Sequence, residues 1–217
     1  MGSQLAEERR PRGRPRLVGD DERRAIIVAT AHDVFLEGGY SATSMDTIAT
    51  RCRISKQTLY RLFSNKFDLF TSVAEVFHRS LLALPRPPDE EMPLDWTLEQ
   101  IFDIDIDPAD DLERVRFFEM INSEAVEHPE VAELICEKGV DRGTRLMADW
   151  LMIEERRGRL DIGDDPLDTA AILLDMTFGA LATHYRAEFQ APDPDWRRRH
   201  IRRAISIFLR GAATASS

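Results

Sequence analysis

A run of polar side chains at residues 55–61 has the types and the spacing needed to contact a nucleic acid. The run falls in a short predicted helix whose other side is apolar, and its polar members are Ser55, Lys56, Gln57, Thr58, Tyr60 and Arg61. Glutamine and arginine can read base edges, a threonine methyl group can touch thymine, and lysine and tyrosine suit phosphate oxygens. This pattern predicts contact with the major groove of DNA.

The preceding residues are predicted to form a second short helix that braces the first. Ala49 is small where two helices must approach closely, while Thr43 or Ser44 can cap the bracing helix and Ser55 can cap the polar one. Two short helices around a tight turn are typical of a helix-turn-helix. The alternative is an ordinary helical hairpin with an exposed polar face.

An arginine-rich segment lies further upstream, with five arginines in residues 9–16. Together with its proline and glycine content, this composition predicts a disordered arm at residues 1–19. One interpretation is a solubilising tail. The other places Arg12 and Arg14 in a narrow A·T-rich minor groove, because residues 11–15 (PRGRP) resemble an AT-hook core.

The net charge of the whole chain, −10, argues against nucleic-acid binding, but this charge is unevenly distributed along the sequence. Residues 1–66 hold 12 Lys and Arg against 8 Asp and Glu, a balance of +4, whereas the remainder holds 17 against 31, a balance of −14. A modestly basic N-terminal module therefore precedes an acidic body. Repulsion by this body would confine DNA contact to one end of the molecule.

Helical periodicity runs through the chain, and no convincing strand pattern appears. Prolines at residues 85–93 mark a linker, and five helical segments are predicted beyond it, at 94–103, 108–127, 130–156, 166–189 and 194–212. The predicted fold is all-α, with about nine helices. The expected organisation is the arm at 1–19, a three-helix DNA-binding domain at 20–66, a connecting helix at 65–84, and a ligand-binding and dimerisation domain at 85–217.

Other classes of function find little support in the sequence. No P-loop, dinucleotide fingerprint or nucleophile elbow is present, so catalysis and a cofactor are not expected. Glu124 with His128, and His184 with Glu188, are spaced to share a helix face, but each pair lacks an evident third ligand, so no metal is expected. No apolar run approaches the roughly 18–20 residues that span a membrane, and no secretory signal begins the chain, so a cytoplasmic protein is expected.

Residues 27–70 resemble the TetR/AcrR family of one-component bacterial regulators. The matching positions are Ile27, Ala31, Val34-Phe35, Gly39-Tyr40, Thr43-Ser44, Ile48-Ala49, Ile54 through Tyr60, Phe63, Asn65-Lys66 and Leu69-Phe70. Residues 113–185 also resemble the AefR-like branch. The resemblance implies a nine-helix homodimer that binds a double-stranded, palindromic operator and responds to a small-molecule effector.

The resemblance extends the set of predicted DNA contacts. Lys66 opens the fourth helix, where members of the family typically clamp a backbone phosphate. Arg53 occupies a turn position that is usually glycine, and a positive φ there would cost on the order of 1 kcal/mol. Two interpretations follow: the turn is slightly remodelled, or Arg53 adds a phosphate contact. The full predicted set is Arg12, Arg14, Thr43, Ser44, Arg53, Ser55, Lys56, Gln57, Thr58, Tyr60, Arg61 and Lys66.

Two apolar stripes near the C-terminus could form either an internal core or the dimer interface implied by the family. We expect the interface, formed by Leu173, Leu174, Leu181, Tyr185, Ile201, Ile205 and Phe208. The arginines at 197–199, 202 and 203 could be a second DNA site, but we expect them to form the solvated side of the last helix.

Aromatic and methionine side chains in the same region suit an adaptable apolar pocket, although each alone is more often core. We expect two or three of them to line a cavity for a largely apolar effector. The candidates are Phe102, Phe117, Phe118, Ile121, Met147, Trp150, Met176 and Phe178. The sequence thus predicts a ligand-responsive DNA-binding regulator, with repression expected and an activator or effector-free architectural protein as the alternative.

Overall fold

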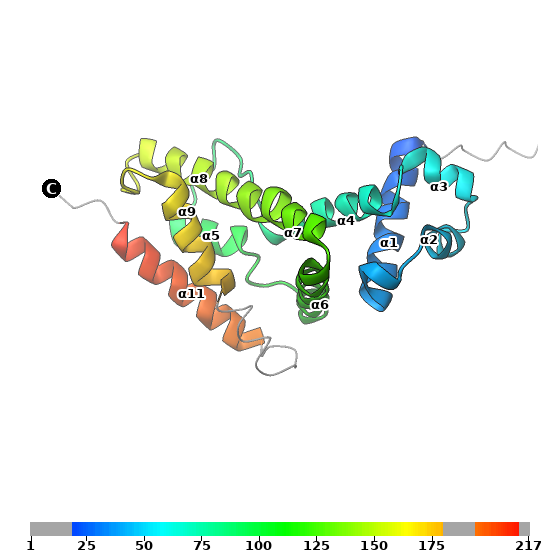
Figure 1. Ribbon diagram of the computed structural model, residues 1–217. Coiled ribbons are helices and arrows are strands. Elements are labelled where there is room, and N and C mark those ends of the chain that lie inside the picture. The colour runs from blue at the N-terminus through cyan, green and yellow to red at the C-terminus, as the bar shows by residue number, and fades with distance from the viewer. Residues whose placement is uncertain (1–18, 180–193, 213–217) are drawn as a thin grey trace, which may run out of the picture.

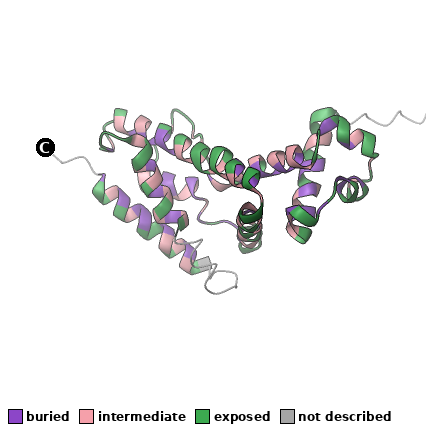
Figure 2. Cartoon of the chain, in the orientation of Figure 1, coloured by how far each residue is buried: buried purple, intermediate pink, exposed green. Residues whose placement is uncertain are grey.

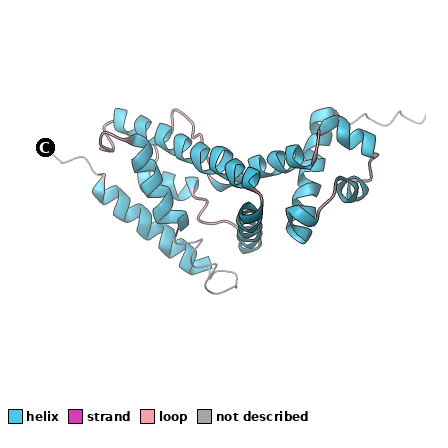
Figure 3. Ribbon diagram, viewed as in Figure 1, coloured by secondary structure: helices cyan, strands magenta, loops and turns pink. Residues whose placement is uncertain are grey.

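The computed structural model describes residues 19–179 and 194–212, and every regular element within these ranges is a helix (Figure 3). The N-terminal helices are α1 (Asp20–Ala42), α2 (Met45–Arg51), α3 (Lys56–Leu62) and α4 (Lys66–Leu81). The helices α1, α2 and α3 form a small bundle at one end of the molecule, hereafter the head, and α4 leads from it toward a larger body (Figure 1). The all-α prediction is confirmed.

Local sequence signals set the bounds of the head helices. Ser44, Ser55 and Asn65 precede α2, α3 and α4, and each side chain accepts a hydrogen bond from the backbone N–H three residues later. Such caps satisfy amide groups that lack a partner within the helix. Phe35 and Phe70 meet edge-to-face in the core of the head, with ring centroids 5.1 Å apart.

The body contains the remaining described helices. They are α5 (Leu94–Ile101), α6 (Pro108–Glu127), α7 (Pro129–Leu134), η1 (Ile135–Val140), α8 (Asp141–Arg156), α9 (Pro166–Leu174), η2 (Asp175–Gly179) and α11 (Pro194–Gly211). Proline stands at the first position of α6, α7 and α9, where the missing N–H costs no helical hydrogen bond. The proline breaks therefore predicted these bounds closely.

Two stretches of π-helix interrupt the body. The first, η1, falls where the predicted segment 130–156 carries Gly139, and the second, η2, follows α9 directly. Wide turns of this kind are uncommon and frequently occur at functional sites. Both stretches border the cavity described below.

Buried side chains form two cores, and the first of them joins the head to the body (Figure 2). Phe117 and Ile121 of α6, with Val131 and Leu134 of α7, pack into the same core as α1–α4. The second core lies among α5, α8, α9 and α11. The helix α6 thus contributes directly to the packing of the head.

The described ranges contain no helix with both the length and the apolar content needed to cross a bilayer. Within the same ranges, His, Cys, Asp and Glu side chains form no group of three or more that could hold a metal ion.

Candidate DNA interface and ligand cavity

The predicted helix-turn-helix is present as α2, a turn at residues 52–55, and α3. Ser44 Oγ accepts a hydrogen bond from Thr47 N, and Ser55 Oγ accepts one from Thr58 N, both at 3.1 Å. Thr58 Oγ1 also lies 2.8 Å from Ser55 Oγ. These hydroxyls fix the first turns of the two helices, so Ser44 and Ser55 are confirmed as caps.

The turn between the helices passes through a left-handed residue. Arg53 has φ = 55°, and the backbone N–H of Ile54 reaches back to the carbonyl of Ala49 at 3.0 Å. A positive φ at a residue with a Cβ costs on the order of 1 kcal/mol. The conformation that the family obtains with glycine is therefore kept here with arginine, and the Arg53 side chain is exposed beside α3.

The outer face of α3 presents both free and ion-paired polar groups. Gln57 is exposed, and half of Tyr60 is accessible. Lys56 Nζ lies 2.6 Å from Asp46 of α2, whereas Arg61 makes two 2.8 Å hydrogen bonds to Asp20 of α1. The Arg61 pair raises the pKa of the guanidinium and lowers the pKa of the Asp20 carboxyl, chiefly through these hydrogen bonds.

Two predicted DNA contacts have other roles in this structure. Thr43 is buried, and its hydroxyl donates to the Gly39 carbonyl at 2.7 Å, so it supports the end of α1 and is not accessible to DNA. Lys66 Nζ donates to the carbonyls of Tyr40 at 2.8 Å and Ser41 at 3.3 Å and lies 4.3 Å from the centroid of the Tyr40 ring. Burial lowers the pKa of Lys66. Arg12 and Arg14 lie outside the described residues.

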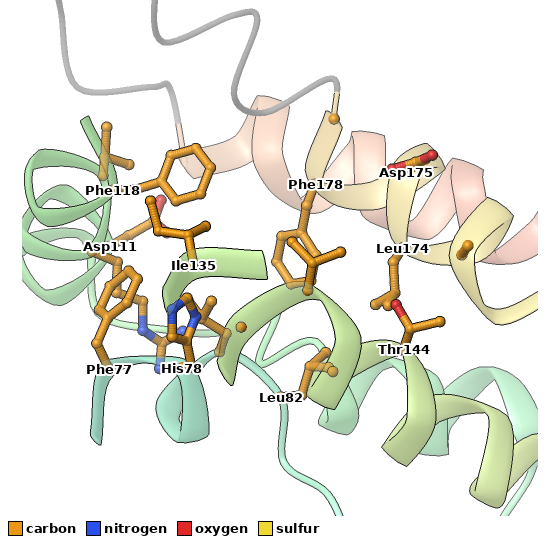
Figure 4. Close-up of a pocket in the computed structure, with 18 of the residues that line it drawn as sticks. Phe77, His78, Leu82, Asp111, Phe118, Ile135, Thr144, Leu174, Asp175 and Phe178 are labelled. Carbon is orange, nitrogen blue, oxygen red and sulfur yellow. The ribbon is translucent and has the colours of Figure 1, made fainter. Parts of the chain in front are cut away.

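The body contains a cavity of about 420 Å³. Phe77 and His78 of α4, Asp111 and Phe118 of α6, and Phe178 of η2 lie around it (Figure 4). The remaining lining residues are Leu81, Leu82, Arg114, Val115, Ile135, Gly139, Val140, Gly143, Thr144, Ala171, Leu174, Asp175, Gly179 and Arg197. The volume lies within the range of small-molecule pockets, roughly 300–1,000 Å³.

Of the predicted cavity residues, Phe118 and Phe178 line this cavity and six others do not. Phe117 and Ile121 are buried in the core that α6 shares with the head, and Phe102, Met147 and Trp150 are buried in the core of the body. Met176 is half-buried and is likewise absent from the lining. Apolar type alone could not separate residues facing a cavity from residues filling a core, because both sit on the inner faces of helices.

The predicted dimer residues require a similar correction. Leu173, Ile201, Ile205 and Phe208 are buried within a single chain, in the core of the body, and Leu174 lines the cavity. Leu181 and Tyr185 lie outside the described residues. For the described residues, the two apolar stripes therefore form an internal core and not a dimer interface, because α9 and α11 use these side chains to pack on the body of their own chain.

A buried ion pair lies at one side of the cavity, and the sequence did not predict it. Arg197 is 3% exposed and hydrogen-bonds to the carbonyls of Phe102 at 3.1 Å, Asp103 at 3.0 Å and Ile104 at 3.3 Å. Its Nε lies 3.2 Å from the Asp111 carboxylate. The prediction of a solvated face is thus wrong for Arg197. Its spacing from Ile201, i to i+4, was the signal that could have placed it on the inner face.

His78 is a second cavity residue that the prediction missed. It lies on the inner face of α4 next to Phe77, between Ala74 and Leu81 at helical spacing. Burial lowers the pKa of its imidazole to about 4, so the ring is neutral at pH 7. The spacing from Ala74 indicated an inward position, but the sequence did not show whether the ring would meet a cavity or a partner.

A polar junction connects the end of α6 to the end of α1. The Glu124 carboxylate accepts a 3.2 Å hydrogen bond from Ser41 N and a second from the Ser41 hydroxyl, which also lies 2.8 Å from His128 Nε2. Gly39, with φ = 80°, lies beneath this contact, where a Cβ would come within 2.8 Å of Glu124. We call Ser41, Glu124 and His128 the α1–α6 junction.

The head and the cavity together define a helix-turn-helix regulator with a separate ligand-binding body. The chain belongs to the tetR family of bacterial regulatory proteins: its residues 27–73 match the family's N-terminal model, and residues 98–211 match the model of the AefR-like transcriptional repressor C-terminal domain. The second match alone covers more than half of the chain. The protein is thus a DNA-binding transcriptional regulator and not an enzyme.

Individual relatives agree with this assignment. The chain is 36% identical to the HTH-type transcriptional activator FasR of Mycolicibacterium smegmatis over 44% of this chain and 48% of FasR. It is 28% identical to the HTH-type transcriptional regulator UidR of Escherichia coli K12 over 73% of this chain and 80% of UidR. The solved structure of the flavonoid-responsive regulator FrrA is similar with a TM-score of 0.65 and 26% identity, covering 90% of this chain and all of FrrA.

Proposed function

We propose that the protein is a homodimeric repressor that binds a palindromic operator and is released when a small, largely apolar molecule fills the cavity. The proposal is carried by one observation: two helices, α4 and α6, each extend from the head to the cavity. The helix α4 begins at the helix-turn-helix and carries Phe77 and His78 to the cavity, while α6 carries Asp111 and Phe118 there and ends on the head at Glu124.

In the proposed complex, α3 lies in the major groove. Gln57 would read a base edge, Tyr60 would contact a phosphate, and Lys56 and Arg61 would exchange their carboxylate partners for phosphates. Their carboxylate partners, Asp46 and Asp20, belong to exposed ion pairs, which are worth little and are readily broken. In the free protein, Lys56 and Arg61 are therefore held near α3 by carboxylates that compete only weakly with DNA phosphates.

Release would follow from a shift of α6 relative to the head. A ligand between α4 and α6 would contact α6, the helix that ends at the α1–α6 junction. The cavity residue Phe118 and the junction residue Glu124 are less than two helical turns apart on this helix, so a shift at the cavity would reach the junction directly. A different position of α6 would tilt the head. In a dimer it would change the separation of the two α3 helices, which must lie about 34–36 Å apart to reach successive major grooves.

The proposed dimer uses the outward sides of α9 and α11. Ile172 of α9 is 50% exposed and Ile207 of α11 is 48% exposed, and both lie on helices whose opposite sides already fill the core. A two-fold pairing of these faces would match a palindromic operator. The alternative function is activation, which the similarity to FasR, a transcriptional activator by name, favours. The binding geometry would be the same in both cases.

The direct test is equilibrium binding to DNA flanking the gene of this protein, measured by fluorescence anisotropy against a shuffled fragment of equal composition. We expect binding at least a thousandfold tighter to the native fragment, as is typical of specific recognition. Equal affinity for the two fragments would contradict specific operator binding.

Removing residues 1–16 is expected to weaken operator binding and to flatten its salt dependence. For every phosphate that the shortened protein no longer neutralises, the slope of log K against log salt should become shallower by about 0.9. The check is a salt titration of the truncated and full-length proteins on the same fragment. An unchanged affinity and slope would show that Arg12 and Arg14 do not bind DNA.

Replacing Glu124 by glutamine is expected to weaken the coupling between cavity and DNA. Glutamine keeps the shape of the Glu124 side chain but removes the negative charge of the carboxylate, which accepts the hydrogen bond of the Ser41 hydroxyl and lies beside His128. Coupling free energies are typically about 1–3 kcal/mol, so the ratio of operator affinities with and without effector should fall by up to roughly a hundredfold. Effector affinity itself should change little. A variant with full coupling would show that the α1–α6 junction transmits no signal.

A further inference from the structure

One charged residue at the cavity has no partner among the residues that the structure describes. Asp175 of η2 belongs to the cavity lining, is exposed, and makes no ion pair or side-chain hydrogen bond within those residues. Because the side chain is exposed, water solvates this carboxylate while the cavity is empty. A ligand that fills the cavity displaces part of that water, and a charge that loses water needs another partner. A ligand suited to this cavity therefore brings a donor for Asp175.

The other charged residues of the lining already have partners. Arg197 binds three carbonyls and lies 3.2 Å from the Asp111 carboxylate, and Arg114 Nη2 lies 3.1 Å from Asp103, which stands outside the lining. His78 is neutral at pH 7, because burial lowers the pKa of its imidazole to about 4. Within the described part of the chain, the cavity thus carries one negative charge that no cation balances.

Asp175 lies on the side of α9 and η2 that faces the cavity. Ala171, Leu174 and Phe178, which stand four residues before, one before and three after Asp175, line the cavity as well. Residues three and four apart in a helix lie on the same side of it. Figure 4 shows Asp175 and Phe77 toward opposite ends of the lining. The unbalanced charge therefore marks one end of the space.

The rest of the wall is largely apolar and partly aromatic. Phe77 of α4, Phe118 of α6 and Phe178 of η2 stand around the space, with aliphatic side chains between them (Figure 4). Aromatic rings pack favourably edge-to-face or offset against a second ring. An apolar ring system therefore suits the wall away from Asp175.

A protonated amine is the ligand group that fits the Asp175 end. An ionised carboxylate only accepts hydrogen bonds, whereas an ammonium group offers three donors and the opposite charge. The Phe178 ring is one helical turn from Asp175, and the face of an aromatic ring also attracts a cation. A ligand carboxylate would instead be repelled by Asp175, and it would have to take Arg114 or Arg197 from its present partner.

We infer that the cavity binds a molecule with an apolar, aromatic body and a protonated amine that pairs with Asp175. This inference rests on the proposed function in taking the cavity as the effector site. It adds the sign of the ligand's charge and its orientation, with the amine at η2 and the ring system against Phe77 and Phe118.

The test compares three probes that share one ring system, 2-naphthylmethylamine, 2-naphthylmethanol and 2-naphthoate. Isothermal calorimetry measures their binding to the full chain at pH 7 and low salt, without DNA. In the wild type we expect the amine to bind about two- to fivefold more tightly than the alcohol, the range for a pair with an exposed carboxylate. Because 2-naphthoate is repelled where the amine is attracted, the amine should bind about tenfold more tightly than 2-naphthoate.

Two variants assign the preference for the amine to Asp175. Asp175→Asn keeps the shape of the side chain and removes its charge, so it should abolish the preference while changing the affinity for the alcohol less than about twofold. Asp168→Asn is the matched control, since Asp168 is exposed on α9 and lies outside the lining. It removes the same charge about 10 Å further along the helix and should retain the preference.

Four results would overturn the inference: no preference for the amine in the wild type, tightest binding of 2-naphthoate, an undiminished preference in Asp175→Asn, or no binding of any probe. Equal losses in Asp175→Asn and Asp168→Asn would also contradict pairing at Asp175. Because these measurements contain no DNA, they are independent of the regulatory proposal. If the preference holds but the amine leaves operator affinity unchanged, the ligand chemistry stands and the proposed release mechanism is wrong.

Discussion

Replacing Arg197 by methionine is expected to lower the free energy of unfolding by about 3–5 kcal/mol, the usual cost of breaking a buried ion pair by removing one partner. The guanidinium is almost fully buried and binds three carbonyls of residues 102–104 as well as Asp111. Methionine fills similar space but leaves the carbonyls and the carboxylate without their donor. Urea denaturation followed by circular dichroism measures the change.

A control and a second variant separate this effect from a general weakening of α11. Arg203→Met alters an exposed arginine on the same helix and should change stability by less than about 0.5 kcal/mol. Adding Asp111→Asn to Arg197→Met should restore part of the loss, because the buried charge is then removed. Equal effects of Arg197→Met and Arg203→Met would contradict the structural role assigned to Arg197.

Replacing Gln57 by alanine is expected to remove most of the protein's sequence preference at one base pair in each half-site. A well-formed amide contact to a base contributes about 1–3 kcal/mol of discrimination. Two copies act in a dimer, so the ratio of affinities for the operator and for an operator changed at both positions should fall by roughly 30-fold or more. Gln57 is exposed on α3 and lies outside the cores, so the fold should be unaffected.

Tyr60→Phe provides the matched comparison on the same helix. It removes a hydroxyl proposed to contact a phosphate, and it should therefore weaken binding to every sequence by a similar factor. Lys66→Ala is a poorer comparison, because Lys66 also joins the start of α4 to the end of α1. If Gln57→Ala weakened binding uniformly while Tyr60→Phe altered base preference, the assigned docking of α3 would be wrong.

The sequence predicted the helices and the head well because the signals there are local. Ser44, Ser55 and Asn65 act as caps within three residues, and prolines set the starts of α6, α7 and α9. The sequence marked Arg53 as the residue in place of the family's glycine but left the conformation of the turn open, and the structure shows the positive φ there. Each of these features depends on neighbouring residues in the chain.

The sequence predicted the cavity less well because its lining depends on how distant helices pack. Phe117 and Phe118 are adjacent on α6, yet one fills the core of the head and the other faces the cavity. Arg197 is one of three successive arginines, and only its place opposite residues 102–104 and 111 makes it structural. No local pattern records such a partner from another helix.

The most direct test of operator binding by paired α3 helices is a nuclease footprint of the protein on DNA flanking its own gene. We predict a protected segment with two-fold symmetry, whose half-site centres lie about one helical turn, or roughly 34–36 Å, apart or at a multiple of that spacing. Protection should weaken in the Gln57→Ala variant. A footprint without symmetry, or one that Gln57→Ala and Tyr60→Phe both leave unchanged, would contradict this mode of binding.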